Sequence, residues 1–140
     1  MSEKKSFVDH YFEGKTGDVL RKTITPDWNS TSGHLKLLNI DTSVGSIAEI
    51  GCGIGRLLKE LNSSISKCVG FDASSAMIRE GKEYCESTNI ELIKVDGKGE
   101  LPYESNSFDY VFSFITFQHI PNTNTVLKYV AEMYRLLKDT

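Results

Sequence analysis

The sequence predicts an α/β fold in which helices cover a mostly parallel sheet. From residue 46 onward, short apolar runs alternate with longer segments whose apolar residues recur at helical spacing. Each apolar run is short and nearly continuous, which is typical of a strand buried on both faces of a parallel sheet. The 140 residues suit one structural domain.

Four strands and three helices are expected in this part of the chain. The strands are predicted at residues 46–50, 68–71, 90–95 and 108–114. Helices are predicted at residues 56–64, at 74–87 with Ser74 as N-cap, and from a cap within residues 122–124 onward. The inward side chains of the second helix are expected to be Met77, Ile78, Gly81, Tyr84 and Cys85. Those of the last helix are expected to be Val126, Val130, Met133, Tyr134 and Leu137.

Composition excludes several classes of protein. No apolar run approaches the ~20 residues needed to span a bilayer, and no secretory signal follows Met1, so no membrane partner is expected. The 16 basic residues are scattered and the net charge is −3, which argues against nucleic acid as the main partner. The 3 cysteines form no CxxC pair, so neither a disulfide framework nor a metal site is expected, and a cytoplasmic location fits best.

Three ligand-binding features fall at the ends of predicted strands. A glycine-rich loop, residues 51–55, follows the first strand, and glycines there let a ligand approach the backbone. Asp72 ends the second strand and can accept both hydroxyls of a ribose. Asp96 ends the third strand and can accept from an exocyclic amine such as that of adenine. Because parallel strands end at one edge of the sheet, the sequence predicts a site for an adenosine-containing ligand.

Several of these segments resemble motifs of class I S-adenosylmethionine-dependent methyltransferases. Residues 47–55 (IAEIGCGIG) resemble the first motif, and residues 69–78 resemble the second strand with its acidic end. Residues 101–111 (LPYESNSFDYV) resemble the approach to the fourth strand, and residues 118–121 (QHIP) resemble the segment that follows it. The resemblance implies a Rossmann-like, doubly wound sheet with strand order 3-2-1-4 and helices on both faces.

The resemblance also implies roles for individual residues. Glu49 and the glycine loop, with Gly51, Cys52, Gly53 and Gly55, would face the methionine part of S-adenosylmethionine. Asp72 and Ala73 would meet the ribose side, and the adenine would be met by Met77, Asp96 and Gly97. Phe114 would lie close to the cofactor and to the entrance for the acceptor. Met77 and Phe114 suit a plain core role equally well.

Methyl transfer to a small-molecule acceptor, with S-adenosylhomocysteine as product, is the expected function. The transfer is an in-line displacement that depends mostly on alignment and on exclusion of water, so no dedicated catalytic cluster is required. His119 is the candidate general base. Residues 1–45 are expected to form a helical lid over a core of residues 46–140, with Tyr11 and Trp28 as candidate walls of the acceptor site.

Two alternatives remain open. A nicotinamide dinucleotide also requires glycines and an acid, but its G-x-G-x-x-G fingerprint would place a glycine where this sequence has Arg56, and it assigns no role to Asp96. The second alternative is a cofactor-binding fragment or pseudoenzyme. The family normally continues into further strands beyond the position of residue 140, so the fourth strand is expected to be an apolar edge. Either a longer protein or another chain, such as a second copy, would then cover this edge.

Overall fold

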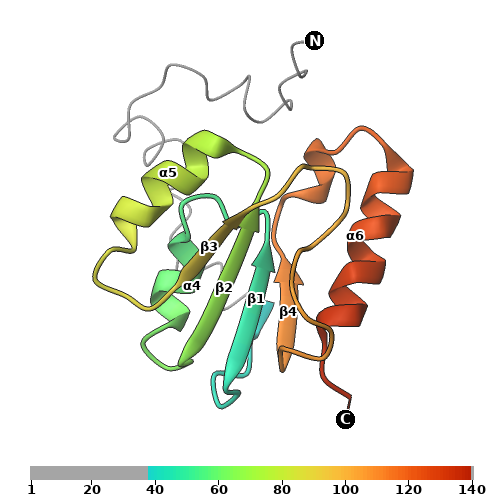
Figure 1. The fold of residues 1–140 in the computed structure, drawn as a ribbon. Coiled ribbons are helices and arrows are strands. Elements are labelled where there is room, and N and C mark those ends of the chain that lie inside the picture. Colours follow the sequence, from blue (N-terminus) through green and yellow to red (C-terminus); the bar gives the residue numbers. More distant parts are fainter. Residues whose placement is uncertain (1–37, 140) are drawn as a thin grey trace.

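A four-stranded parallel sheet forms the centre of the molecule (Figure 1). The computed structural model describes residues 38–139. The strands are β1 (Ser46–Ile50), β2 (Lys67–Asp72), β3 (Glu91–Lys94) and β4 (Tyr110–Ser113), in the order β3-β2-β1-β4. At the carboxyl end of β1, Ile50 lies opposite Phe71 of β2 and Ser113 of β4. The predicted fold class and strand order are confirmed, and all strand ends that carry candidate residues share one edge.

Helices cover both faces of this sheet because β1 is apolar on both sides. Ile47 points into a cluster with α4 (Arg56–Leu61) and α5 (Ser75–Tyr84). Ala48 and Ile50 point the other way, into a cluster with α6 (Thr123–Leu136). Figure 1 shows the resulting three layers, with α4 and α5 on one face and α6 on the other. The alternation of side chains along one buried strand therefore requires two helical layers.

Two of the predicted helix starts are confirmed by their capping hydrogen bonds. The Ser74 side chain accepts from the Met77 amide at 3.2 Å, and the Asn122 side chain accepts from the Asn124 amide at 2.9 Å. The helices end earlier than predicted, since turns replace their last residues: α4 ends at Leu61 and α5 at Tyr84. A short 3₁₀ helix, η1 (Phe117–His119), follows β4 and was not predicted.

The face that the last helix turns toward the sheet was predicted only in part, since Met133 packs against the core as expected. Val130 and Tyr134 were expected to point inward but are 49% and 81% exposed, whereas Tyr129 and Leu136 are buried. Hydrogen bonds of Arg135 explain this orientation of the helix. Its guanidinium donates to the carbonyls of Leu101 and Tyr103, both at 2.8 Å. Because these bonds keep the Arg135 face of α6 against residues 101–105, the apolar stripe that contains Val130 and Tyr134 faces outward.

Asp109 ties the beginnings of β1 and β4 together. Its Oδ2 accepts from the amides of Gly45 and Ser46 at 3.1 and 3.0 Å, and from the Ser46 hydroxyl at 3.0 Å. The Asp109 amide returns a bond to the Ser46 hydroxyl at 2.9 Å, and Lys138 lies 3.4 Å from Oδ1. These contacts hold the pKa of Asp109 below its usual value, the Ser46 hydroxyl being the largest cause. The acid of the SFD segment therefore organises the sheet rather than the ligand edge.

We expect Asp109→Ala to lower the midpoint of thermal unfolding at neutral pH. Three donors at the start of β1 lose their acceptor, and two of them belong to Ser46, which is only 3% exposed. A folded-state pKa below 3.8 means that the contribution is present above that pH and is lost as the pH falls through the folded pKa. Thermal melts at pH 7 and pH 3, with the exposed Asp139→Ala as control, test this; an equal deficit at both pH values contradicts it.

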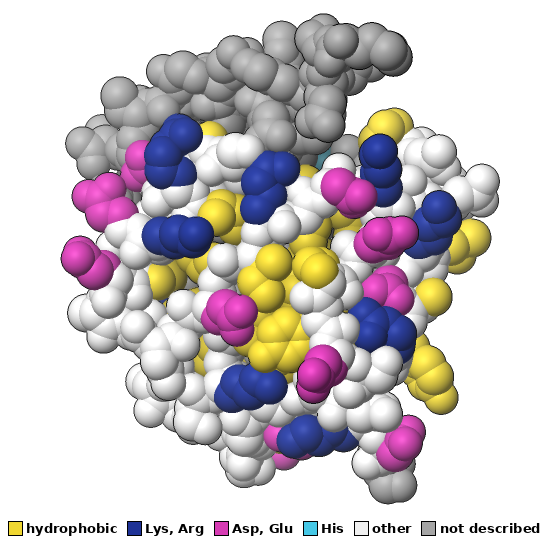
Figure 2. Space-filling model, in the orientation of Figure 1, with side chains coloured by type: hydrophobic (Ala, Val, Ile, Leu, Met, Phe, Trp, Pro, Cys, Tyr) yellow, Lys and Arg dark blue, Asp and Glu magenta, His cyan; other side chains and the backbone are white. Residues whose placement is uncertain are grey.

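The N-terminal predictions lie outside the described residues. These are most of the helical lid predicted for residues 1–45, and the positions of Tyr11 and Trp28. Within residues 38–139, no helix has the length and apolarity that a membrane span requires. Acidic and basic side chains intermingle on the visible face of the described residues, around an apolar centre (Figure 2).

Candidate functional site

The glycine-rich loop turns sharply between β1 and α4. Gly51, Gly53 and Gly55 all have positive φ, at 75°, 59° and 88°. A side chain on Gly51 would collide with Thr116, which follows β4. The amides of Gly51 and Cys52 donate to the Phe71 carbonyl at 2.7 and 3.1 Å. The loop is thus held against the ends of β2 and β4, with its backbone at the ligand edge.

Asp72 joins the end of β2 to this loop. Its Oδ2 accepts from the Gly53 amide at 2.8 Å, and its Oδ1 accepts from the Ser74 amide at 2.8 Å. The side chain is only 8% exposed. A carboxylate oxygen can accept more than one hydrogen bond, so these amides orient the group and still leave it suited to vicinal hydroxyls. The predicted ribose acid therefore also organises the glycine loop.

The loop after β3 meets the loop after β2. Gly97 has φ 80°, and a Cβ placed on it would lie 3.4 Å from the Cβ of Ala73. Asp96 is exposed, and its Oδ1 accepts from the Lys98 amide at 2.8 Å. Asp72 and Asp96 were predicted at neighbouring strand ends, and the loops that follow these two strands are in contact.

Glu49 is a buried carboxyl near the carboxyl end of β1. Its side chain is 3% exposed, and its Oε1 has no hydrogen-bond partner among residues 38–139. Burial raises its pKa to about 8, with Arg56 opposing the rise and Asp72 adding to it. A buried acceptor without a donor is costly in a folded protein. Such a group indicates a place for a cationic or hydrogen-bond-donating ligand.

Three other predicted cofactor residues are partly or wholly core residues. Met77 packs against Ile54, and Phe114 packs half-buried against the cluster of α4 and α5. Cys52 is buried in the same cluster, and a Cβ on Gly70 would lie 2.6 Å from its Sγ. Burial, and then the charges of Asp72 and Glu49, raise the pKa of the Cys52 thiol well above its usual value, so it is a poor nucleophile.

The segment after β4 borders the glycine loop. His119 is exposed on η1, and its Nε2 lies 3.3 Å from Nε2 of Gln118. Ile115 has φ 56°, which is unusual for a β-branched residue, and is 52% exposed. The Thr116 hydroxyl donates toward the Ile50 carbonyl at 3.4 Å. Thr116 and Ile115 were missed by the sequence reasoning, because neither a threonine nor an isoleucine in a loop is itself a signal.

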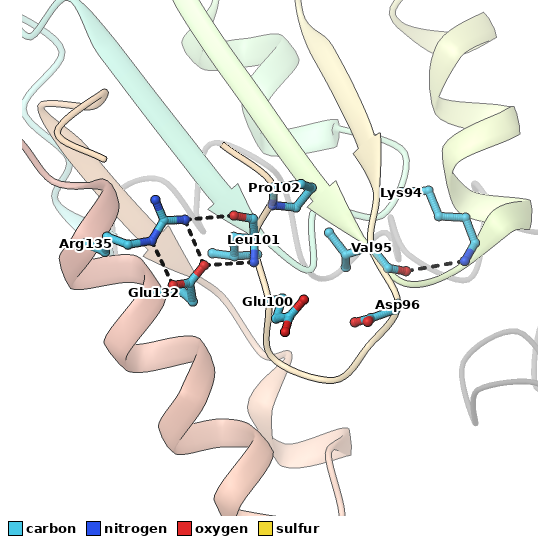
Figure 3. A pocket seen from close by; sticks show the side chains of 8 residues that line it. All are labelled: Lys94, Val95, Asp96, Glu100, Leu101, Pro102, Glu132 and Arg135. Carbon is cyan, nitrogen blue, oxygen red and sulfur yellow. Dashed lines mark hydrogen bonds and ion pairs between the residues drawn. The ribbon is translucent and has the colours of Figure 1, made fainter. Parts of the chain in front are cut away.

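A surface hollow lies beside this edge, between the end of β3 and α6 (Figure 3). It has a volume of 470 Å³ and shares only Asp96 with the predicted site residues. Its wall on α6 is the pair Arg135 and Glu132, in contact at 2.8 Å, and Glu132 accepts from the Leu101 amide at 3.0 Å. Because Arg135 and Glu132 pair with each other and bind the backbone of Leu101, this wall has a structural role.

Comparison with known proteins decides between the ligands that such an edge could bind. Residues 47–140 match a family described as a methyltransferase domain. The chain belongs to this methyltransferase family. The class I S-adenosylmethionine-dependent resemblance is confirmed, and the nicotinamide alternative is disfavoured. Within residues 38–139, no group of acidic, histidine and cysteine side chains is arranged to hold a metal ion.

The relatives of this methyltransferase chain are longer than the chain itself. It is 36% identical to a demethylmenaquinone methyltransferase of Staphylococcus aureus, over 99% of this chain and 53% of the relative. It is 29% identical to the protein of the same name from Oceanobacillus iheyensis, over 98% of this chain and 60% of the relative. The chain therefore spans between about half and three-fifths of the curated relatives that it matches.

Solved structures place the methyltransferase fold on the same elements. The PH0226 protein of Pyrococcus horikoshii aligns with a TM-score of 0.75 and 26% identity, over 92% of this chain and 61% of that one. A phosphoethanolamine N-methyltransferase 2 of Haemonchus contortus, solved with phosphomonomethylethanolamine and S-adenosylhomocysteine, aligns with a TM-score of 0.75 and 27% identity. That alignment covers 99% of this chain and 34% of the other.

Proposed function

We propose that this methyltransferase chain binds S-adenosylmethionine at the carboxyl edge of its sheet. The observation that carries the proposal is the junction of the glycine loop with Asp72, at 2.8 Å from the Gly53 amide, beside a buried carboxyl that lacks a donor. The family match supports the same ligand. The residues fit the cofactor because they offer acceptors for its hydroxyls and ammonium group, and exposed backbone for close approach.

The roles proposed for individual residues are those that the family resemblance implies. Glu49 and the loop with Gly51, Gly53 and Gly55 bind the amino acid part of the cofactor. Asp72 and Ala73 hold the ribose, and Asp96 with Gly97 meets the adenine. Met77 and Cys52 support the pocket from the core, as their burial indicates. Phe114 lies close to the cofactor and to the entrance for the acceptor.

The reaction that we propose is methyl transfer to a small molecule. The name of the Staphylococcus aureus relative mentions demethylmenaquinone, and that of the Haemonchus contortus structure mentions phosphoethanolamine; both support an acceptor of this class. The cofactor supplies a methyl group on a good leaving group, so the protein has to align the acceptor and exclude water, which can contribute about 7–11 kcal/mol. In this proposal His119, on η1 beyond β4, accepts the proton that the methyl acceptor loses.

A second candidate is a cofactor-binding module that needs a further segment or chain for turnover. The outward stripe of α6 favours it, because Leu127, Val130 and Tyr134 are exposed large apolar side chains on one helix. Isolated surface apolar residues are common, whereas a stripe of them marks contact with other protein. Binding without turnover distinguishes this candidate from the active enzyme.

Calorimetric titration of the full chain with S-adenosylmethionine tests the proposal. We expect binding in the micromolar range and no binding of NADH at the same concentration. Turnover is then measured with candidate acceptors, and a His119→Gln chain should keep its affinity for the cofactor while losing rate, by about 10²–10⁴-fold if the histidine is the base. A folded chain that binds NADH, or that binds neither ligand, contradicts the proposed function.

A further inference from the structure

Glu49 is a buried carboxyl whose protonation state the fold alone does not explain. Its Oε1 is the buried side-chain oxygen that lacks a hydrogen-bond partner within residues 38–139. The residues opposite it in the sheet are Gly70 of β2 and Phe112 of β4, which offer no side-chain donor. An ionised carboxylate in such a place is disfavoured, because its buried Oε1 has no hydrogen-bond donor.

The charged and titratable groups around Glu49 do not remove this cost. Arg56 of α4 favours the ionised form, but its own guanidinium is partly desolvated, which lowers its pKa. Asp72 of β2 acts in the opposite direction and disfavours a second negative charge. Cys52 of the glycine loop is held as a neutral thiol. With burial as the largest cause, the pKa of Glu49 is raised to about 8, so the carboxyl carries a proton at pH 7.

We propose that the empty site holds Glu49 as a neutral carboxylic acid, and that binding of the cofactor's ammonium group expels this proton to solvent. The inference rests on the proposed function, since it requires the cofactor at this edge. In the empty protein the O–H bond of the carboxyl is intact. On binding, that proton leaves to the buffer, the electron pair stays on the carboxylate, and the incoming positive charge replaces the proton. Cofactor binding is therefore linked to pH through one buried group.

The linkage has a measurable stoichiometry. A carboxyl with pKa about 8 is mostly protonated at pH 7. Titration of the full chain with S-adenosylhomocysteine, in two buffers of different ionisation enthalpy, should therefore reveal release of about 0.9 proton per molecule bound. The dissociation constant should fall about ninefold between pH 6 and pH 7, because the ionised form must be made before the ammonium group binds.

Variants distinguish this group from other acids and bases. Glu49→Gln should bind without proton release and with a dissociation constant that does not change between pH 6 and pH 7. Glu86→Gln, an exposed acid after α5, should keep the wild-type proton release and slope.

The Glu49→Gln chain could lose its fold or its affinity, so a second measurement uses the wild-type chain alone. The infrared difference spectrum of the wild-type chain should show the carbonyl stretch of a protonated carboxyl disappearing when S-adenosylhomocysteine is added. Binding with release of less than about 0.2 proton at pH 7 overturns the inference and leaves the proposed function standing. A folded chain that does not bind the compound overturns both.

Discussion

An Asp72→Ala chain is expected to bind S-adenosylmethionine at least about a hundredfold more weakly than the wild type. Hydrogen bonds to a charged group contribute about 1.5–3 kcal/mol each, and the proposed ribose contact removes two of them. The same substitution leaves the amides of Gly53 and Ser74 without their present acceptor, so the glycine loop loses its anchor as well. Isothermal titration gives the change in affinity.

The loss of affinity must be separated from a loss of folding. Urea unfolding of Asp72→Ala should show a decrease in the free energy of unfolding of about 2–4 kcal/mol, because the buried amide of Ser74 and the partly buried amide of Gly53 lose their acceptor. Ser74→Ala is the matched control, since it removes the cap on Met77, at a cost of about 1 kcal/mol, but leaves the carboxylate in place. If Ser74→Ala weakens binding as much as Asp72→Ala does, Asp72 is not a direct contact.

The second large effect concerns the stability of the empty protein. Glu49 has a pKa of about 8 in the folded chain and 4.5 as its reference value, so the folded state holds a proton that the unfolded state releases between these values. This raised pKa contributes stability that is fully present below pH 4.5 and is lost as the pH rises through 8. The contribution lost by pH 8 is on the order of 4 kcal/mol.

A Glu49→Gln chain should therefore be less sensitive to pH than the wild type. Urea unfolding from pH 5 to pH 8 should give a falling free energy of unfolding for the wild type and a nearly constant one for the variant. Glu86→Gln should follow the wild-type curve. Parallel curves for the wild type and Glu49→Gln would mean that this carboxyl is solvated or paired in the empty protein.

The parts of the fold that depend on local pattern were predictable. Short apolar strands separated by amphipathic segments gave the correct element order, and small polar caps such as Ser74 and Asn122 marked the correct helix starts. The inward face of α6 was predicted only in part: Met133 packs against the core as expected, but Val130 and Tyr134 belong to a second apolar stripe that faces outward. The choice between these stripes depends on Arg135 reaching residues 101–105, a contact across the chain that periodicity does not encode.

The candidate site shows a similar division. Strand ends placed Asp72 and Asp96 at one edge from the sequence alone. The burial of Glu49 without a donor is a three-dimensional property, and only the family resemblance pointed to this residue. Thr116 fills the space beside Gly51 from a segment 65 residues away along the chain, so no local motif could have revealed it.

The two backbone bonds of Asp72 also affect how this motif should be interpreted in proteins with altered activity. A residue that holds its own loop in place is retained by selection for folding, even after selection for turnover has ceased. A descendant that had lost catalysis would then still carry the acid and the glycines. Counting proteins that carry the motif would therefore overestimate the number of active enzymes. The residues that contact the methyl acceptor would be the first to change.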